Sequence, residues 1–178
     1  MDHPIVEPNM YAIKAMLILD GDGNRLIAKY YDETFPLVKE QKTFERNLFN
    51  KTSKGSGEII LIDGLTCVYK SNVDLFFYVI GSNKVNELLL TQTLTCLYES
   101  VQKVLGKCFE KRVFMDNLGS IFLILDEIVD SGIVCETDSR SVIQRASIRT
   151  EEQQPLGEQT VAQVLLSAKE QLKWSLLK

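Results

Sequence analysis

The alternation of hydrophobic and polar positions near the start of the chain predicts a β-hairpin over residues 12–31. Its first arm is apolar on both faces beyond Lys14, whereas its second arm alternates between polar and apolar side chains. A strand that is apolar on both faces must be covered on both, so we expect the first arm inside a sheet and the second arm half solvated. Residues 20–24, with the sequence DGDGN, tolerate positive φ and suit a tight turn.

Three further apolar runs, at 58–62, 65–70 and 75–80, predict three more strands. Turn-forming residues separate them, including Asp63 and Gly64, so consecutive strands should be antiparallel neighbours. Together with the hairpin they make about five strands. The run at 75–80 is apolar on both faces and is expected near the middle of the sheet.

Helical periodicity follows each group of strands. We expect a first amphipathic helix from a cap at Thr34, with Pro36 in its first turn, to about residue 50. Glu45 is expected on the solvent side of this helix. Further helical segments are expected at 86–106, 108–115, 118–129 with an end near Gly132, 138–149 and 158–178, and a short extended piece at 133–136.

Strands and helices are segregated along the chain, which predicts an α+β fold. The order of elements is that of the longin-like (SNARE-like) fold: an antiparallel sheet with the first helix on one face and the later helices on the other. Residues 1–149 are expected to form one longin-like small-subunit domain. Residues 150–178 are expected to form a polar linker and a C-terminal amphipathic helix.

Composition narrows the function classes. The 178 residues carry a net charge of -4 with the two signs interspersed, which argues against a nucleic-acid partner. No apolar run approaches the roughly 20 residues that a membrane span requires, and the first residues lack the pattern of a secretory signal. The four scattered cysteines are expected to be reduced, buried thiols of a cytosolic protein: Cys67, Cys96, Cys108 and Cys135.

One candidate metal motif lies in the first hairpin turn. Asp20, Asp22 and Asn24 have the spacing of the first ligands of a calcium loop. Arg25 stands where that loop needs glycine, and Tyr31 where it needs a bidentate glutamate. We therefore interpret the segment as a plain turn.

Other candidate chemistry is sparse. The glycine-rich residues 55–57 lack the lysine of a phosphate-binding loop. The acidic residues Asp126, Glu127 and Asp130 are expected to form a solvated helix face. The only histidine, His3, lies in a terminal segment, which argues against a catalytic triad or a histidine-ligated zinc. We expect no catalytic residue, no cofactor site and no metal site.

The predicted C-terminal helix has an apolar stripe that must dock either on its own domain or on a partner chain. Trp174 is its most conspicuous side chain. The candidate residues for a partner interface are Leu172, Trp174, Leu177, Tyr98 and Phe109.

Several long blocks resemble the coatomer zeta-subunit family. They extend along nearly the whole chain: YAIKAMLILD (11–20), AKYYDETFP (28–36), KEQKTFERNLFNKT (39–52), VYKSNVDLFFYVIGS (68–82), LDEIVDSG (125–132) and SAKEQLKWSLLK (167–178). Ser131 departs from the family pattern, which has glycine there, and residues 83–86 also differ from it. A weaker similarity extends to the sigma chains of clathrin adaptors, which share the longin-like fold.

The resemblance implies a non-catalytic structural subunit of the COPI coat, acting in Golgi-to-ER and intra-Golgi transport. It implies a heterodimer with the trunk of the coatomer gamma subunit, contacts with other coatomer subunits, and recruitment by an Arf-family GTPase carrying GTP. The expected location is cytoplasmic, peripheral to Golgi membranes and COPI-coated vesicles, with no cofactor.

The alternatives are a sigma-type chain that binds dileucine sorting signals, a regulatory longin domain of a SNARE, and an enzyme. The positions that align with the dileucine pocket lie near Tyr98, Lys107, Cys108 and Val113, and a tyrosine and a lysine suit two leucines poorly. Residues 158–178 are too few for a SNARE helix followed by a membrane anchor.

Overall fold

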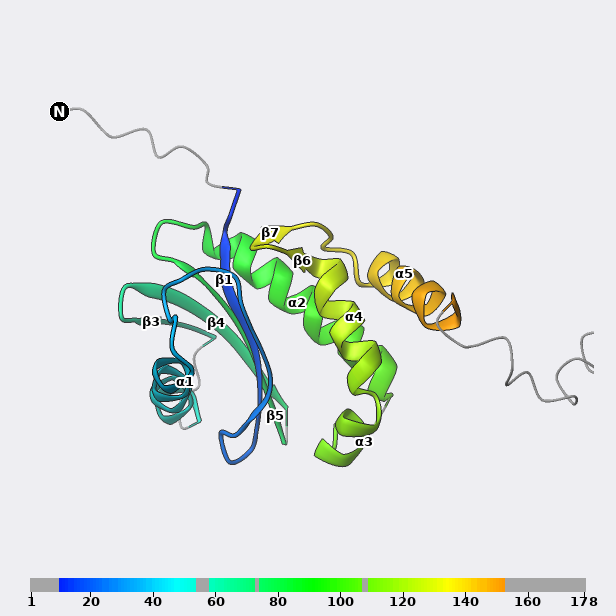
Figure 1. Ribbon diagram of the computed structural model, residues 1–178, viewed down its shortest axis with the longest axis horizontal. Coiled ribbons are helices and arrows are strands. Elements are labelled where there is room, and N and C mark those ends of the chain that lie inside the picture. Colours follow the sequence, from blue (N-terminus) through cyan, green and yellow to red (C-terminus); the bar gives the residue numbers. More distant parts are fainter. Residues whose placement is uncertain (1–9, 54–57, 73, 107–108, 153–178) are drawn as a thin grey trace, which may run out of the picture.

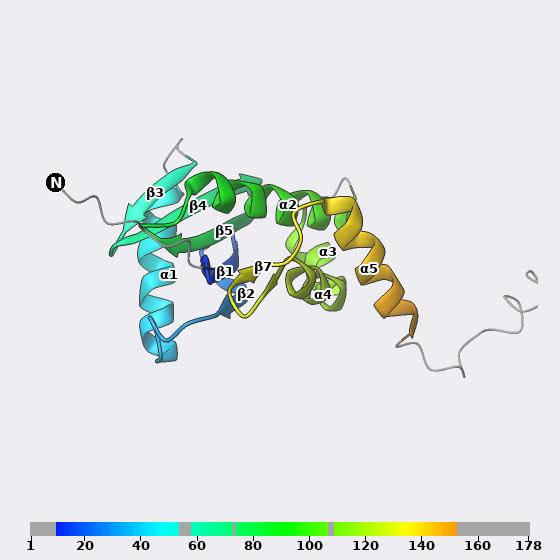
Figure 2. The same ribbon diagram turned by 90° about the horizontal axis from the view of Figure 1, so that it is seen from above.

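A five-stranded antiparallel sheet separates helix α1 from helices α2 to α5, as Figures 1 and 2 show. The computed structural model describes residues 10–53, 58–72, 74–106 and 109–152. The strands of the sheet are β1 (Ile13–Asp20), β2 (Arg25–Tyr30), β3 (Ile59–Ile62), β4 (Leu65–Asn72) and β5 (Leu75–Ser82). The helices are α1 (Val38–Thr52), α2 (Glu87–Leu105), α3 (Lys111–Asp116), α4 (Leu118–Ile128) and α5 (Ser139–Glu152).

The strand order β2-β1-β5-β4-β3 places β1 and β5 inside the sheet. Both strands are apolar on both faces, so the two predictions of interior strands are confirmed. Each neighbouring pair is antiparallel. The tight turn between β3 and β4 has positive φ at Asp63 (49°) and Gly64 (76°), which matches the right-handed twist of a hairpin.

The two faces of β1 contribute to two separate cores. Ala15, Leu17 and Leu19 pack toward α1, against Phe44 and Leu48. The other face packs under α2 and α4, in a cluster that includes Met16, Ile18, Phe77, Val79, Leu90, Leu97, Ile121 and Leu125. Burying each such side chain contributes about 1.5–3 kcal/mol. Strand β1 therefore helps to stabilise both cores. The expectation of one helix on one face and the later helices on the other is confirmed.

Helix α1 begins later than the sequence predicts. The Thr34 hydroxyl donates to the Asp32 carboxylate at 2.6 Å, and the Thr34 backbone N–H donates to the same carboxylate at 3.1 Å. Thr34 is therefore held in a local turn and does not cap the helix. The backbone N–H of Leu37, the residue before the helix, is instead satisfied by the Glu40 side chain at 3.3 Å.

Helix α4 ends earlier than predicted, at Ile128. The next residues form a two-stranded hairpin of β6 (Val129–Asp130) and β7 (Ile133–Val134), turned by Ser131 at φ 50° and Gly132 at φ 86°. The Gly132 carbonyl accepts a hydrogen bond from the Ile13 N–H at 3.0 Å, which fastens this hairpin to the start of β1. A Cβ on Gly132 would lie 2.7 Å from the Ile13 oxygen, so the close approach requires glycine.

Two solvent-side predictions are wrong. Glu45 is only 3% exposed, although it lies on the polar side of the α1 pattern. Glu127 is 8% exposed and lies 3.8 Å from Arg145. Of the other two residues of that predicted face, Asp126, which pairs with Lys29, and Asp130 are exposed as expected. For Glu45 and Glu127, a basic side chain from a neighbouring element allows the carboxylate to be buried.

The cysteines are buried only in part. Cys67 and Cys96 are buried free thiols, and burial raises the pKa of Cys67 to about 12 and that of Cys96 to about 11. Cys135, which follows β7, is exposed, contrary to the prediction, and Cys108 lies outside the described residues.

The helical stripe predicted over 138–149 is confirmed in α5, where Val142 and Ala146 are buried. Helix α5 continues to Glu152. The division of the chain at residue 149 stays a prediction.

Candidate partner interface

The turn that resembles a calcium loop is held together by its own chain. The Asp20 carboxylate accepts from the backbone N–H groups of Asp22 (3.0 Å) and Asn24 (2.7 Å) and from Lys111 Nζ (2.8 Å). Both oxygens are therefore engaged within the protein, as a plain turn requires. In the described ranges, no three His, Cys, Asp or Glu side chains gather where they could hold a metal ion.

Tyr98 on α2 and Phe109, two of the five candidate interface residues, lie in one aromatic cluster. Their rings stack with centroids 5.5 Å apart, and the Tyr98 ring also meets Phe77 of β5 edge-on at 5.4 Å. Lys70 Nζ lies 4.2 Å from the centre of the Tyr98 ring, and Asn72 donates to the Tyr98 hydroxyl at 3.0 Å. The cluster therefore joins α2 to the β4–β5 hairpin and leaves Tyr98 half-buried.

Tyr98 is also one of the positions that were expected from the sequence to align with the dileucine pocket of adaptor sigma chains. Phe109 is 9% exposed, so its ring belongs mainly to the core. Val113 is half-buried and packs against the same core, while Lys107 and Cys108 lie outside the described residues. The Tyr98 ring is thus packed by Phe109, Phe77 and Lys70.

A buried charge cluster joins α1 to β2. Glu45 accepts from Arg25 Nε at 3.0 Å and from the Tyr30 hydroxyl at 2.9 Å. Burial, followed by the neighbouring Glu45 charge, raises the pKa of Tyr30 far above its ordinary value. Arg25 also donates to Gln41 at 3.2 Å, so the guanidinium is held on two sides by α1. The cluster fixes the angle of α1 on the sheet, which makes its outer face a rigid surface.

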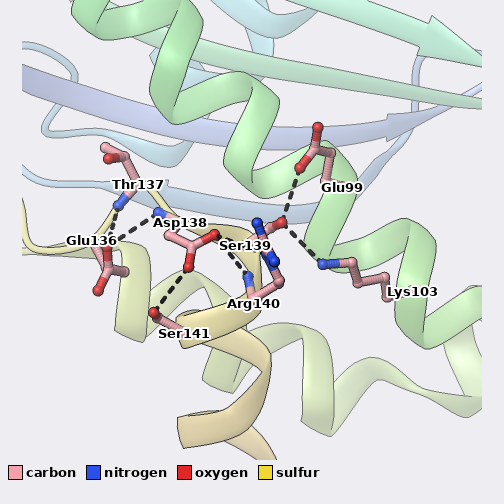
Figure 3. A network of polar contacts seen from close by, with 8 residues as sticks. All are labelled: Glu99, Lys103, Glu136, Thr137, Asp138, Ser139, Arg140 and Ser141. Atoms are coloured by element: carbon pink, nitrogen blue, oxygen red, sulfur yellow. Dashed lines mark hydrogen bonds and ion pairs between the residues drawn. The ribbon is translucent and has the colours of Figure 1, made fainter.

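The start of α5 is tied to α2 by polar contacts (Figure 3). The Ser139 hydroxyl donates to Glu99 at 2.9 Å and accepts from Lys103 Nζ at 3.1 Å. Asp138 caps the helix by accepting from the Arg140 N–H at 3.3 Å and the Ser141 hydroxyl at 3.1 Å. These contacts fix the start of α5 against α2.

The strand expected at 58–62 carries exposed apolar side chains that were not predicted from the sequence. On β3, Ile59 is 50% exposed and Leu61 is 67% exposed. The signal was present in the run IILI, which has no charged residue inside it. Other exposed apolar side chains are scattered over α1, α2, α3 and α4: Leu37, Val38, Leu88, Met115 and Phe122.

The remaining three candidate interface residues, Leu172, Trp174 and Leu177, lie outside the described residues. The structure brings together Tyr98 and Phe109 only. No helix among the described residues is long and apolar enough to cross a membrane.

Comparison with known proteins identifies the class of this fold. A family model described as the clathrin adaptor complex small chain matches residues 12–153. A chain from a homology model of the full-length AP-3 complex in a stretched open conformation superposes with a TM-score of 0.62 at 18% identity, covering 79% of this chain and 94% of that chain. The five-stranded sheet with helices on both faces is thus the fold of an adaptor-type small chain.

Curated relatives narrow the class further. Coatomer subunit zeta-1 of Homo sapiens is 56% identical over 178 residues, which is 100% of both chains. Coatomer subunit zeta-2 of Mus musculus is 55% identical over 172 residues, covering 97% of this chain and 83% of that one, and coatomer subunit zeta-1 of Arabidopsis thaliana is 40% identical over 171 residues, covering 93% and 97%. The chain belongs to the coatomer zeta-subunit family, the small chains of the COPI vesicle coat.

Proposed function

We propose that this chain is a non-catalytic structural subunit of the COPI coatomer that pairs with the trunk of the coatomer gamma subunit. The pair acts in Arf-GTP-dependent coat assembly at Golgi membranes, for Golgi-to-ER and intra-Golgi protein transport. The chain itself is cytoplasmic and peripheral to the membrane, and it contributes no cofactor or catalytic group.

The single observation that carries this proposal is the 56% identity to a coatomer zeta-1 chain along the whole length of both proteins. An identity of this size with no gap in coverage favours the same partner surfaces as well as the same fold. The packing supports a rigid subunit, because the interior residues Met16, Leu17 and Ile18 are fully buried and α1 is held by a buried ion pair. A rigid domain suits a role as a wedge that stabilises a helical solenoid by burying apolar area against it.

The alternative of a sigma-type receptor for sorting signals is less well supported. Tyr98 and Phe109 occupy the region where a dileucine pocket would lie. The Tyr98 ring packs edge-on against Phe77, so moving it would uncover Phe77.

For the partner surface, we propose that Leu172, Trp174 and Leu177 contact the large subunit. They lie on the apolar stripe that the sequence predicts for residues 158–178, which fall outside the described residues. Tyr98 and Phe109 contribute by holding the β4–β5 hairpin against α2.

The test is co-expression with the trunk of a coatomer gamma subunit, followed by size-exclusion chromatography with light scattering. We expect a one-to-one complex that survives moderate salt, because an apolar interface is little screened. Trp174→Ala should weaken the complex by about 30-fold, as for a central aromatic contact. Met115→Ala, a change at an exposed apolar residue of α3, should leave it unchanged. Two separate, folded peaks for the unsubstituted chains would overturn the proposal.

A further inference from the structure

We propose that the outer edge of β3, which pairs with no other strand of the described residues, is a docking site for an extended segment of another polypeptide, which adds to the sheet as a sixth strand. The segment has alternating apolar side chains and basic residues at its ends. This proposal does not depend on the pairing with a gamma subunit.

The first argument is the direction of the backbone groups of β3. The Tyr69 N–H donates to the Glu58 carbonyl at 2.9 Å, and the register pairs Ile60 with Cys67 and Ile62 with Leu65. In an antiparallel pair, every second residue directs its N–H and C=O to the neighbouring strand. The residues between them, Ile59 and Leu61, therefore direct these groups away from β4, along the open edge of the sheet.

The second argument is that the same two residues have exposed side chains. Ile59 is opposite Val68 and Leu61 is opposite Thr66, so both lie on the face of the sheet that α2 covers further in. They remain 50% and 67% exposed because β3 is the outermost strand, as Figure 2 also shows. Ile60 and Ile62 turn to the opposite face and pack with the α1 core. Ile59 and Leu61 thus have both outward-directed backbone groups and exposed apolar side chains.

The third argument is the lack of protection. Edge strands of soluble proteins are usually guarded by a lysine, a proline or a bulge. The strand IILI has no charged residue and no proline, and its register with β4 is regular from Ile59 to Ile62. By contrast β2, the other edge, carries Arg25 and Lys29 and pairs with β1 through an irregular register. The edge of β3 is therefore open to pairing with a strand of a partner.

The kind of partner follows from the geometry and the charge. A helix laid on this edge would cover the two side chains but leave the outward N–H and C=O groups unpaired, whereas an extended strand pairs both. The strand is flanked by exposed carboxylates, Glu58 at one end and Asp63 at the other. A second copy of this chain paired antiparallel would bring acidic ends together. A strand with basic ends meets opposite charges instead, so a basic-flanked segment is the better occupant.

The experiment titrates the full chain with the synthetic peptide KVTVTVTK, amidated and acetylated, and follows backbone amide shifts by NMR. We expect saturable binding with a dissociation constant on the order of 100 μM, since only a few residues pair. The largest shifts should be at Ile59 and Leu61. The acidic counterpart EVTVTVTE should bind at least fivefold more weakly.

Two variants distinguish backbone pairing at β3 from nonspecific hydrophobic binding of the peptide. Leu61→Pro removes an outward N–H that β4 does not use, so it should lower peptide affinity at least tenfold while the fold is retained. Leu61→Lys retains the N–H but adds a repelling charge and should lower affinity similarly, which keeps the test valid if the proline variant fails to fold. Leu88→Lys, at a leucine on α2 that is 62% exposed, is the matched control and should bind as the unsubstituted chain does.

Binding by both Leu61 variants that is as tight as binding by the unsubstituted chain would overturn the proposal. Shifts centred away from β3, or no saturation up to millimolar peptide, would overturn it too. Preference for the acidic peptide would also overturn it. Concentration-dependent self-association that Leu61→Pro abolishes would instead assign the edge to a second copy of this chain and reject the basic-flanked occupant.

Discussion

Arg25 and Glu45 form a two-point ion pair between β2 and α1, with Nε–Oε2 at 3.0 Å and Nη2–Oε1 at 2.6 Å. The Glu45 side chain is 4% exposed and that of Arg25 is 27% exposed. Solvent therefore reaches the ion pair mainly through the arginine. Paired and hydrogen-bonded on both oxygens, the carboxylate is tolerated in the interior.

Removing the charge at this pair should destabilise the domain. In Glu45→Gln, the Arg25 guanidinium loses its counter-ion and the Tyr30 hydroxyl loses a charged acceptor, so the free energy of unfolding should fall by about 2–3 kcal/mol. Chemical denaturation followed by circular dichroism measures this. Lys42→Gln, at an exposed position on the same helix, should change the midpoint little. An equal loss in both variants would contradict the role given to the pair.

The turn around Asp20 predicts an acid dependence of stability. Burial alone would raise the pKa of Asp20, but hydrogen bonds from Lys111, Asn24 and Asp22 outweigh it and hold the pKa below the ordinary value of 3.8. Because the unfolded chain takes up the proton first as pH falls, this stabilisation is complete above pH 3.8 and is lost as pH falls through the lowered folded value.

The measurement is the free energy of unfolding from pH 6 down to about pH 2, compared with Asp20→Asn. We expect the unsubstituted chain to lose stability more steeply below about pH 4 than the variant does. Lys111→Met should show an intermediate slope, since it removes one of the donors that lower the pKa. Parallel curves for all three would rule out Asp20 as a source of the acid dependence.

The contacts in Figure 3 predict local opening of α5 when they are removed. Ser139→Ala deletes the hydroxyl that joins α5 to Glu99 and Lys103, at a cost of about 1 kcal/mol. Amide hydrogen exchange should therefore quicken in residues 139–147 while protection in β1 and β5 is unchanged. Ser147→Ala is the control, because the Ser147 hydroxyl contacts only the Ile143 carbonyl of its own helix. Uniform acceleration over the whole sheet would show that α5 does not open separately.

The Tyr98 cluster predicts how the chain responds to an acidic dileucine peptide. The unsubstituted chain should show no binding by fluorescence anisotropy up to millimolar peptide, because the Tyr98 ring is already packed against Phe77 and Phe109. Tyr98→Ala should lower the free energy of unfolding by about 2–3 kcal/mol through the lost ring contacts. Micromolar binding by the unsubstituted chain would instead favour the hypothesis that it is a sigma-type chain that binds sorting signals.

Most of the sheet could be predicted because strands that are apolar on both faces have a distinctive pattern, as in β1 and β5. The central place of both strands follows from that pattern alone. The two cores also follow, since α1 and the later helices show clear apolar stripes. Local periodicity was therefore sufficient for the arrangement of layers.

The errors arose where one distant or competing contact decides the outcome. Glu45 looked solvated because its partner Arg25 lies 20 residues away along the chain. Thr34 looked like a helix cap, but its hydroxyl donates a hydrogen bond to the nearby Asp32 carboxylate instead. The end of α4 was missed because pairing of Val129 with Val134 overrides helical periodicity. The exposed edge of β3 was missed since an apolar strand pattern does not tell an inner strand from an outer one.

The interior position of β1 also affects how the chain is made. Its first neighbour, β2, follows at once, but its other neighbour, β5, is synthesised only after α1, β3 and β4. During translation the nascent β1–β2 hairpin therefore leaves the ribosome with one open edge and with apolar faces that α1 and α2 have yet to cover. The hydrogen bond from Ile13 to Gly132 closes later still, when most of the domain has emerged. Until then the open edge of β1 is available for pairing with a wrong strand.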